Sequence, residues 1–275
     1  MAAVDELPVQ EAMSLRLMRS SLRFGARIAS MLALLVLWQL ISDSGIVTVF
    51  QLPSFTRVLS RIWEDAVAGD LWINTAVTLY RALAGFAIAA VGGIVLGMAM
   101  SRIKLVHWFF DPIVSIGFPM PKIAFLPVII LWLGVYDTSK ITMIVFDAIF
   151  PVIAATMIAI ECVEREFVWS ARNMGANERE VLWQVVLPAA LPQIMTGLQV
   201  ALPLSLIVAV VTEMLMGGYG LGGAMMTASR FANSPGVFAG IVEIAIIGYV
   251  LVKIMALIRG RLLIWHSEAH DPSTV

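Results

Sequence analysis

Long apolar runs, separated by short polar segments, constrain this chain more than any other feature of its sequence. A helix needs about 20 mainly apolar residues to cross the hydrocarbon core of a bilayer. With 60% hydrophobic and 13% charged residues, the chain lies far from the roughly 25% charge content of soluble domains. We therefore predict an all-α integral membrane protein with about six transmembrane helices. The expected spans are 28–41, which is short, and 79–100, 109–133, 141–160, 197–216 and 237–258.

The distribution of basic residues predicts the orientation of these spans. An even number of spans places both termini on one side, and cytoplasmic segments carry an excess of Lys and Arg. Twelve of the 18 basic residues fall in segments that are internal if the N-terminus is cytoplasmic, and six fall elsewhere. We therefore expect a cytoplasmic segment at 1–27, a transmembrane domain at 28–262 and a cytoplasmic tail at 263–275.

Two local patterns predict a close contact between helices and a helix on the membrane surface. Gly93 and Gly97 form a GxxxG pair, which lets a neighbouring helix approach closely. After Pro53 and Ser54, apolar residues recur at helical spacing up to Val67. This second pattern is typical of an amphipathic helix on the membrane surface.

Prolines make the third apolar run unusual. Four of them interrupt 109–133, and Lys122 lies within it. A long straight helix is excluded there, because proline lacks the backbone donor and clashes with the preceding turn. Two interpretations stay open: a broken span that lines a translocation path near Pro121 and Lys122, or a kinked structural helix that begins near Lys122 after an interfacial elbow.

Carboxylates inside the spans are the other candidates for a translocation path. Asp147, Glu213 and Glu243 lie in apolar runs, where an ionised group is costly unless it faces water or a partner. We treat Asp147 and Glu213, with Pro121 and Lys122, as candidate path residues. Structural hydrogen bonds or ion pairs are an equal alternative, and Glu213 could also lie at the external end of its span.

The longest polar segment, 164–198, has well-defined turn chemistry. A helix there is expected to end at Gly175, because glycine readily adopts the left-handed conformation after a helix. Asn177 is a candidate N-cap, and Glu180 stands three residues later in the capping-box position. We expect a second amphipathic helix after this cap, which Pro188 ends.

This polar segment resembles the cytoplasmic loop of ABC importer permeases, whose pattern is E-A-A, three residues, G, nine residues, I-x-L-P. In this chain Ala171, Gly175, Leu187 and Pro188 stand at the spacing of that pattern. Trp169, Ser170 and Val185 replace its glutamate, first alanine and isoleucine.

The resemblance extends from about Leu52 to Trp265 and is greatest to the nitrate, sulfonate and taurine branch. The further matching motifs are LPS at 52–54, Arg81 with Gly85-Phe86, Pro119-Met120-Pro121 with LWLG, VVLPAALPQIMTGL, and Glu213-Met214 with GLG.

The resemblance implies a type I ABC importer permease-like fold in the inner (plasma) membrane, with the EAA loop at 164–193. It further implies two ATPase subunits, a second permease copy or paralogue, and an extracytoplasmic solute-binding protein as partners. The residues expected to couple to the ATPase are Ala171, Gly175, Glu178, Arg179, Glu180, Leu182, Leu187 and Pro188.

The chain itself is not expected to be an enzyme or to bind a cofactor, a metal or nucleic acid. No glycine is followed by lysine, so the phosphate-binding GxxxxGK[ST] motif is absent, as are HExxH and GxSxG. ATP is therefore expected on a partner subunit. Relatives of this branch carry sulfonates, nitrate, taurine and heterocyclic vitamin precursors. The alternative function is an ion-coupled secondary transporter that uses Asp147 and Glu213.

Overall fold

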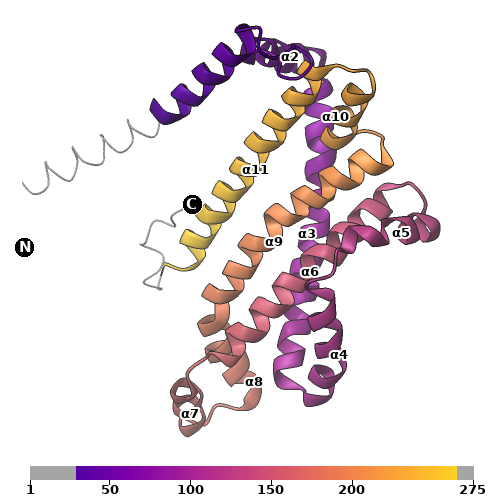
Figure 1. Cartoon of the computed structure of the whole chain (residues 1–275). Coiled ribbons are helices and arrows are strands. Elements are labelled where there is room, and N and C mark those ends of the chain that lie inside the picture. The colour runs from indigo at the N-terminus through magenta and orange to yellow at the C-terminus, as the bar shows by residue number, and fades with distance from the viewer. Residues whose placement is uncertain (1–28, 265–275) are drawn as a thin grey trace, which may run out of the picture.

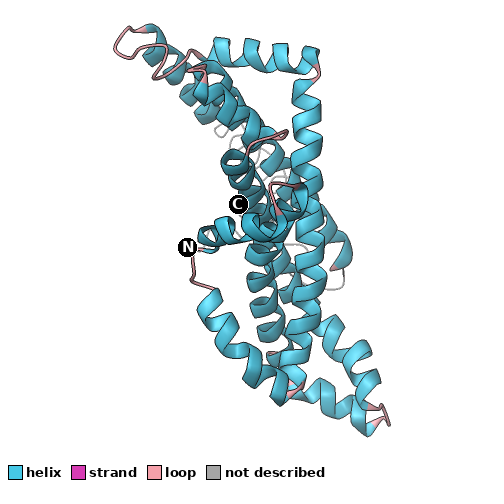
Figure 2. Cartoon of the chain, turned by 90° about the vertical axis from the view of Figure 1, so that its right-hand side faces the viewer, coloured by secondary structure: helices cyan, strands magenta, loops and turns pink. Residues whose placement is uncertain are grey.

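The chain folds into an elongated bundle of helices (Figure 1). The computed structural model describes residues 29–264, so the predicted segment 1–27 and the tail beyond residue 264 lie outside the described range. Every regular element within that range is helical, and short loops join the helices (Figure 2). The elements are helix Ala29–Asp43, α2 Phe55–Ala68, α3 Asp70–Arg102, α4 Lys104–Gly117, η1 Lys122–Phe125, α5 Leu126–Leu133, α6 Asp137–Glu161, α7 Arg165–Asn173, α8 Glu178–Glu180, η2 Val181–Val186, α9 Leu187–Met216, α10 Leu221–Arg230 and α11 Ser234–Leu262.

In the described part of the chain each predicted apolar run is mainly helical, and most helices extend beyond the run. By length and composition, four helices in the described part are able to span a membrane: α3, α6, the continuous helix from α8 to α9, and α11. α4 and the η1–α5 pair form a fifth span if the two halves are counted together. Helix Ala29–Asp43 is apolar but shorter. The all-α membrane fold is confirmed.

The proline-rich run forms a sharp bend rather than a straight span. The axes of α4 and of the helix from Lys122 to Leu133 differ by 98°. Gly117 ends α4, and Pro119 and Pro121 lie in the connection before η1, where a helix cannot continue through them. The predicted break is therefore confirmed.

α3, α6 and α9 form the centre of the bundle, and small residues on α3 bring it close to α6. A Cβ atom added at Gly93 would lie 2.7 Å from Cβ of Val152, and one added at Gly97 would lie 2.7 Å from Cβ of Thr156. The predicted close approach at the GxxxG pair is confirmed, and its partner is α6 of the same chain.

The two ends of the bundle carry different short helices (Figure 1). We call residues 164–187 the elbow, and the end that carries it the elbow end. α2 and α10 lie at the opposite end, here called the α10 end. α2 has the predicted amphipathic character, with Val58 fully buried and Trp63 and Val67 exposed.

Candidate functional site

The elbow has the predicted turn chemistry, and its backbone is fully defined by local hydrogen bonds. Gly175 has φ +89°, the left-handed conformation that follows a helix. The N–H of Gly175 donates to the carbonyl of Arg172, and the N–H of Ala176 donates to that of Ala171. These two bonds form a Schellman motif at the end of α7. The side chain of Asn177 then accepts from the N–H of Glu180, while the Glu180 carboxylate accepts from the N–H of Asn177.

The prediction that Pro188 ends the second helix is wrong. The helix that begins at Glu178 continues without interruption to Met216. Its segment Val181–Val186 is π-helical, and the N–H of Leu187 donates five residues back to Leu182. This π-turn shifts the hydrogen-bond pattern of the helix just before Pro188. The backbone N–H that proline lacks would therefore stand where the π-helical pattern changes to the α-helical one, and the helix continues past the proline. The part of the elbow from Glu178 onward is therefore continuous with α9.

Several predicted coupling residues contact other parts of the elbow. Ala171 is buried, and Val181 behind it is fully buried. The Glu178 carboxylate pairs with Arg172 at 2.7 Å and approaches Arg102 of α3 to 3.9 Å. The carboxylate of Glu180 belongs to the capping box.

The exposed surface of the elbow combines charged side chains with large apolar ones. Trp169 and Trp183 are each 56% exposed, and Met174 is also exposed. Within the described part of the chain, no carboxylate pairs with the exposed side chain of Arg179. Leu182 and Leu187 are partly buried, and Pro188 is exposed.

The structure brings two of the predicted path residues together at the bend between α4 and α5. Nζ of Lys122 lies 3.2 Å from Oδ1 of Asp147, donates to the carbonyl of Phe118 and lies 5.1 Å from the centre of the Phe150 ring. Pro121 is exposed beside this pair. The juxtaposition satisfies both charges inside the bundle, and a role in the path stays a prediction.

The fourth candidate, Glu213, lies apart from this pair, near the α10 end of α9. It is 0% exposed. Its carboxylate pairs with Arg81 at 2.7 Å, and the Thr78 hydroxyl donates to it at 2.8 Å. Arg81 also pairs with Asp137 of α6 at 2.6 Å, so three helices meet at one guanidinium. This position favours structural pairing over solute contact.

The loop between α9 and α10 is held by polar side chains that were not among the predicted site residues. Oδ1 of Asn74 accepts from the N–H of Gly220, and the Thr78 hydroxyl accepts from that of Leu221. Arg81 donates to the carbonyl of Tyr219, and Lys140 donates to that of Gly217. Asn74, Thr78 and Arg81 are spaced i, i+4, i+7, so they share one face of α3. That polar stripe at the start of an apolar span was the signal available in the sequence.

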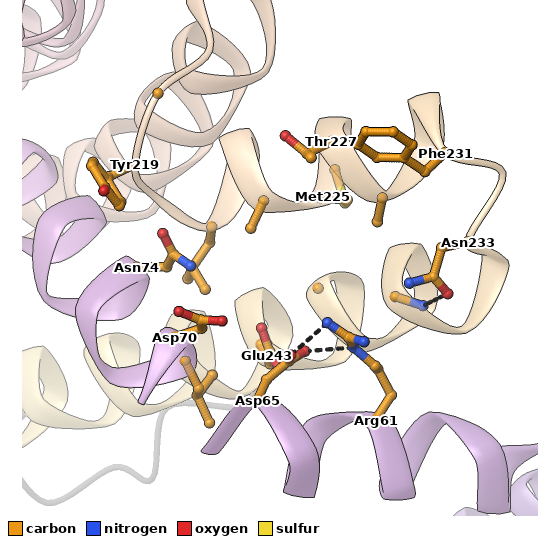
Figure 3. A pocket seen from close by; sticks show the side chains of 17 residues that line it. Arg61, Asp65, Asp70, Asn74, Tyr219, Met225, Thr227, Phe231, Asn233 and Glu243 are labelled. Atoms are coloured by element: carbon orange, nitrogen blue, oxygen red, sulfur yellow. Dashed lines mark hydrogen bonds and ion pairs between the residues drawn. The ribbon is translucent and has the colours of Figure 1, made fainter. Parts of the chain in front are cut away.

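The two larger cavities at the α10 end are lined by charged side chains. The first has a volume of about 480 Å³, and α2, α3, α10 and α11 contribute to its wall (Figure 3). Arg61 and Asp65 of α2 form a bidentate ion pair there, and the Glu243 side chain lies next to them. The second has a volume of about 540 Å³ and is lined by Arg81, the start of α6 and residues 216–219.

An all-helical bundle that crosses a membrane several times, with a structured polar elbow at one end, has the architecture of a multi-pass transport permease. The chain belongs to the family described as binding-protein-dependent transport system inner membrane component, and the match covers residues 89–263. This is a family of transport permeases and not of enzymes.

Several named relatives are similar over most of the chain. The taurine transport system permease protein TauC of Escherichia coli (strain K12) is 31% identical, over 88% of this chain and 90% of the relative. The putative aliphatic sulfonates transport permease protein SsuC of Bacillus subtilis (strain 168) is 29% identical, over 97% of both chains. The nitrate import permease protein NrtB of Synechocystis (strain PCC 6803) is 28% identical, over 82% and 84%. The predicted resemblance to this branch of ABC importer permeases is confirmed.

Solved structures confirm the predicted fold class. An inward-facing form of the MetNI methionine ABC transporter superposes with a TM-score of 0.59 at 19% identity, covering 71% of this chain and 95% of that chain. An amino acid ABC transporter with histidines gives 0.61 at 16% identity, covering 74% and 98%. At these identities the similarity concerns the fold alone.

Proposed function

We propose that this chain is the translocation subunit of an ABC importer that moves a small solute inward while ATPase subunits in trans hydrolyse ATP. The elbow is the observation that carries this proposal. Its turn is held by a Schellman motif, a capping box and the Arg172–Glu178 ion pair, while two tryptophans and Arg179 are exposed. Exposed Trp and Arg are the side chains most enriched where protein interfaces are strongest.

The continuous helix from Glu178 to Met216 supplies a route for coupling. A helix of its 39 residues is about 58 Å long at a rise of 1.5 Å per residue. Because no hinge occurs at Pro188, a displacement of the elbow by an ATPase subunit would move α9 as one body. The far end of α9 carries Glu213, whose ion pair with Arg81 joins it to α3.

The remaining parts of the proposal follow from the relatives and the charge distribution. Two ATPase subunits would bind the elbows of two permease copies, and an extracytoplasmic binding protein would deliver solute at the α10 end. This arrangement places the elbow and both termini in the cytoplasm.

The relatives' names support a sulfonate-like, taurine-like or nitrate-like solute, or a heterocyclic vitamin precursor. Lys122 and Asp147, at the bend beside Pro121, are the proposed path residues.

Replacing Gly175 with valine should uncouple uptake from ATP hydrolysis. A branched side chain in the left-handed region costs about 1–2 kcal/mol, which depopulates the native elbow by roughly five- to thirtyfold. The added Cβ would meet nothing within 4 Å, so the effect is conformational and local. The measurement is ATP-dependent uptake per molecule of permease in the membrane.

Gly69, between α2 and α3, offers a matched control. It has φ +92° and, like Gly175, has open space around the position of a Cβ atom. Gly69→Val should therefore carry similar strain at the α10 end but leave ATPase coupling unchanged. Equal loss of coupling in both variants, or normal coupling in Gly175→Val at normal abundance, would contradict the role of the elbow.

A further inference from the structure

The 540 Å³ cavity at the α10 end has walls that carry charge in an unusual arrangement. It is open on one side, and its volume is within the range of small-molecule sites, about 300–1,000 Å³. Arg81 and Lys140 contribute two cations to its lining, Asp137 contributes one carboxylate, and the aromatic residues Tyr136 and Tyr219 are both largely exposed.

Lys140 is the group that needs an explanation. It is only 3% exposed, and its ammonium donates to the carbonyl of Gly217 at 2.8 Å. Among the described residues, no carboxylate oxygen lies within 4.0 Å of this ammonium. An ammonium has three donors and is costly to bury without a charged partner. Lys140 therefore presents hydrogen-bonding capacity and positive charge to the cavity.

Asp137 presents the opposite charge to the same space. Its Oδ1 receives both contacts from Arg81, at 2.9 Å from Nε and 2.6 Å from Nη2, while its side chain is 55% exposed. Its other carboxylate oxygen has capacity left for a donor. Arg81 also bonds to Glu213 and to the Tyr219 carbonyl, so its protein contacts use four of its five N–H donors.

The formal charge of this cluster is balanced, which restricts the ligand. Arg81 and Lys140 supply two positive charges, and Asp137 and the buried Glu213 supply two negative ones. A simple anion would leave one negative charge in excess in a partly desolvated site, and a simple cation would leave one positive charge. A ligand that carries both charges satisfies Lys140 and Asp137 and keeps the site neutral.

We propose that this cavity is a solute site for a small zwitterion such as an aminosulfonate or amino acid. The anionic group binds the Lys140 ammonium, and the cationic group binds the free oxygen of Asp137. Tyr136 and Tyr219 line the same cavity, and an aromatic ring attracts a cation placed over its face. The inference rests on the proposed function, which it narrows from sulfonate-like, nitrate-like or vitamin-precursor solutes to zwitterions.

The binding test uses the full chain, purified with its ATPase subunits and without binding protein. Three probes of matched size separate the charges: taurine (both charges), ethanesulfonate (anion) and ethylamine (cation). Ligand-dependent thermal stabilisation gives the dissociation constant of each. We expect taurine to bind about tenfold or more tightly than either singly charged probe, since each charged hydrogen bond contributes about 1.5–3 kcal/mol.

Variants show which protein side chain binds the anionic group of the ligand and which binds the cationic group. Lys140→Met should weaken taurine and ethanesulfonate together by about tenfold. Asp137→Asn keeps an acceptor for Arg81 and should weaken taurine about tenfold, with ethanesulfonate unchanged. Lys253→Gln on α11 and Glu64→Gln on α2, both exposed and outside the cavity, are the controls and should change none of the three.

If Lys140 serves only to hold the loop at Gly217, the expected results are different. Lys140→Met would then lower thermal stability without changing the ranking of the three probes, and Asp137→Asn would not separate taurine from ethanesulfonate. Either result overturns the zwitterion site, as does equal binding of all three probes to the unmodified protein. ATP hydrolysis by the complex is measured separately and tests the role of the elbow. A failure of the proposed function can therefore be distinguished from a failure of the zwitterion site.

Discussion

Replacing Arg81 with methionine should lower the free energy of unfolding by about 3–5 kcal/mol, the range expected when one partner of a buried ion pair is removed. The substitution strands Glu213, which is fully buried, with only the Thr78 hydroxyl and the N–H of Gly222 as donors. It also releases the Tyr219 carbonyl and the Asp137 carboxylate. The midpoint of thermal unfolding of the purified protein in detergent measures this loss.

Arg61 provides the matched comparison. It forms a bidentate pair with Asp65 on α2, but the pair is partly exposed and lies within one helix, so Arg61→Met should cost about 0–1 kcal/mol. Adding Glu213→Gln to Arg81→Met should restore part of the lost stability, because the stranded charge is removed. Equal midpoints for the Arg81 and Arg61 variants would show that the buried network does not hold α3, α6 and α9 together.

Alanine at Gly92 and at Gly93 should change stability in opposite directions, although the two positions are adjacent on α3. Alanine normally stabilises a helix interior by about 0.5–1 kcal/mol relative to glycine. At Gly92 the new Cβ would lie 3.5 Å from Cδ1 of Ile149, an ordinary contact. At Gly93 it would lie 2.7 Å from Cβ of Val152 and 3.2 Å from the carbonyl of Ile149, so α3 and α6 must separate.

We expect Gly93→Ala to lose about 1–3 kcal/mol, the usual cost of overpacking a tight contact. Gly93→Leu should lose more, and the amount of protein recovered from the membrane should fall with it. Thermal unfolding of the two alanine variants, side by side, checks the sign. A stabilised Gly93→Ala protein would mean that the close approach of α3 to α6 is not needed by the fold.

Much of the fold could be predicted because bilayer crossing leaves a strong pattern in the sequence. Apolar length alone located α3, α6, α9 and α11, and proline chemistry located the bend before η1. The elbow was predictable for a similar reason. Gly175, Asn177 and Glu180 act through bonds to their own neighbours, so the sequence contains both partners.

Other features depended on contacts between distant residues and could not be predicted. Pro188 was expected to end a helix, yet the π-turn before it absorbs the missing donor, and no local pattern distinguishes these outcomes. The sequence analysis assigned no role to Asp137 and Lys140, which stand just before the apolar run 141–160. Their importance appears only when α6 is placed beside Arg81 and the loop at Gly217.

The candidate path residues were located only in part. The sequence identified Lys122 and Asp147 as ionisable groups in apolar surroundings, without indicating that they pair. It also grouped Glu213 with them, whereas the structure places Glu213 in a separate, fully buried network. Polar residues within spans show that a partner exists, but not which helix supplies it.

The most direct test of a permease that depends on ATPase subunits in trans is uptake into proteoliposomes of defined composition. The chain should be reconstituted alone, and with its ATPase and binding-protein partners, with taurine as the labelled probe. We predict uptake only when the ATPase chains and ATP are present on the side of the elbow and the binding protein is on the α10 side. Uptake by the chain alone, driven by an ion gradient, would contradict this account and favour a secondary transporter.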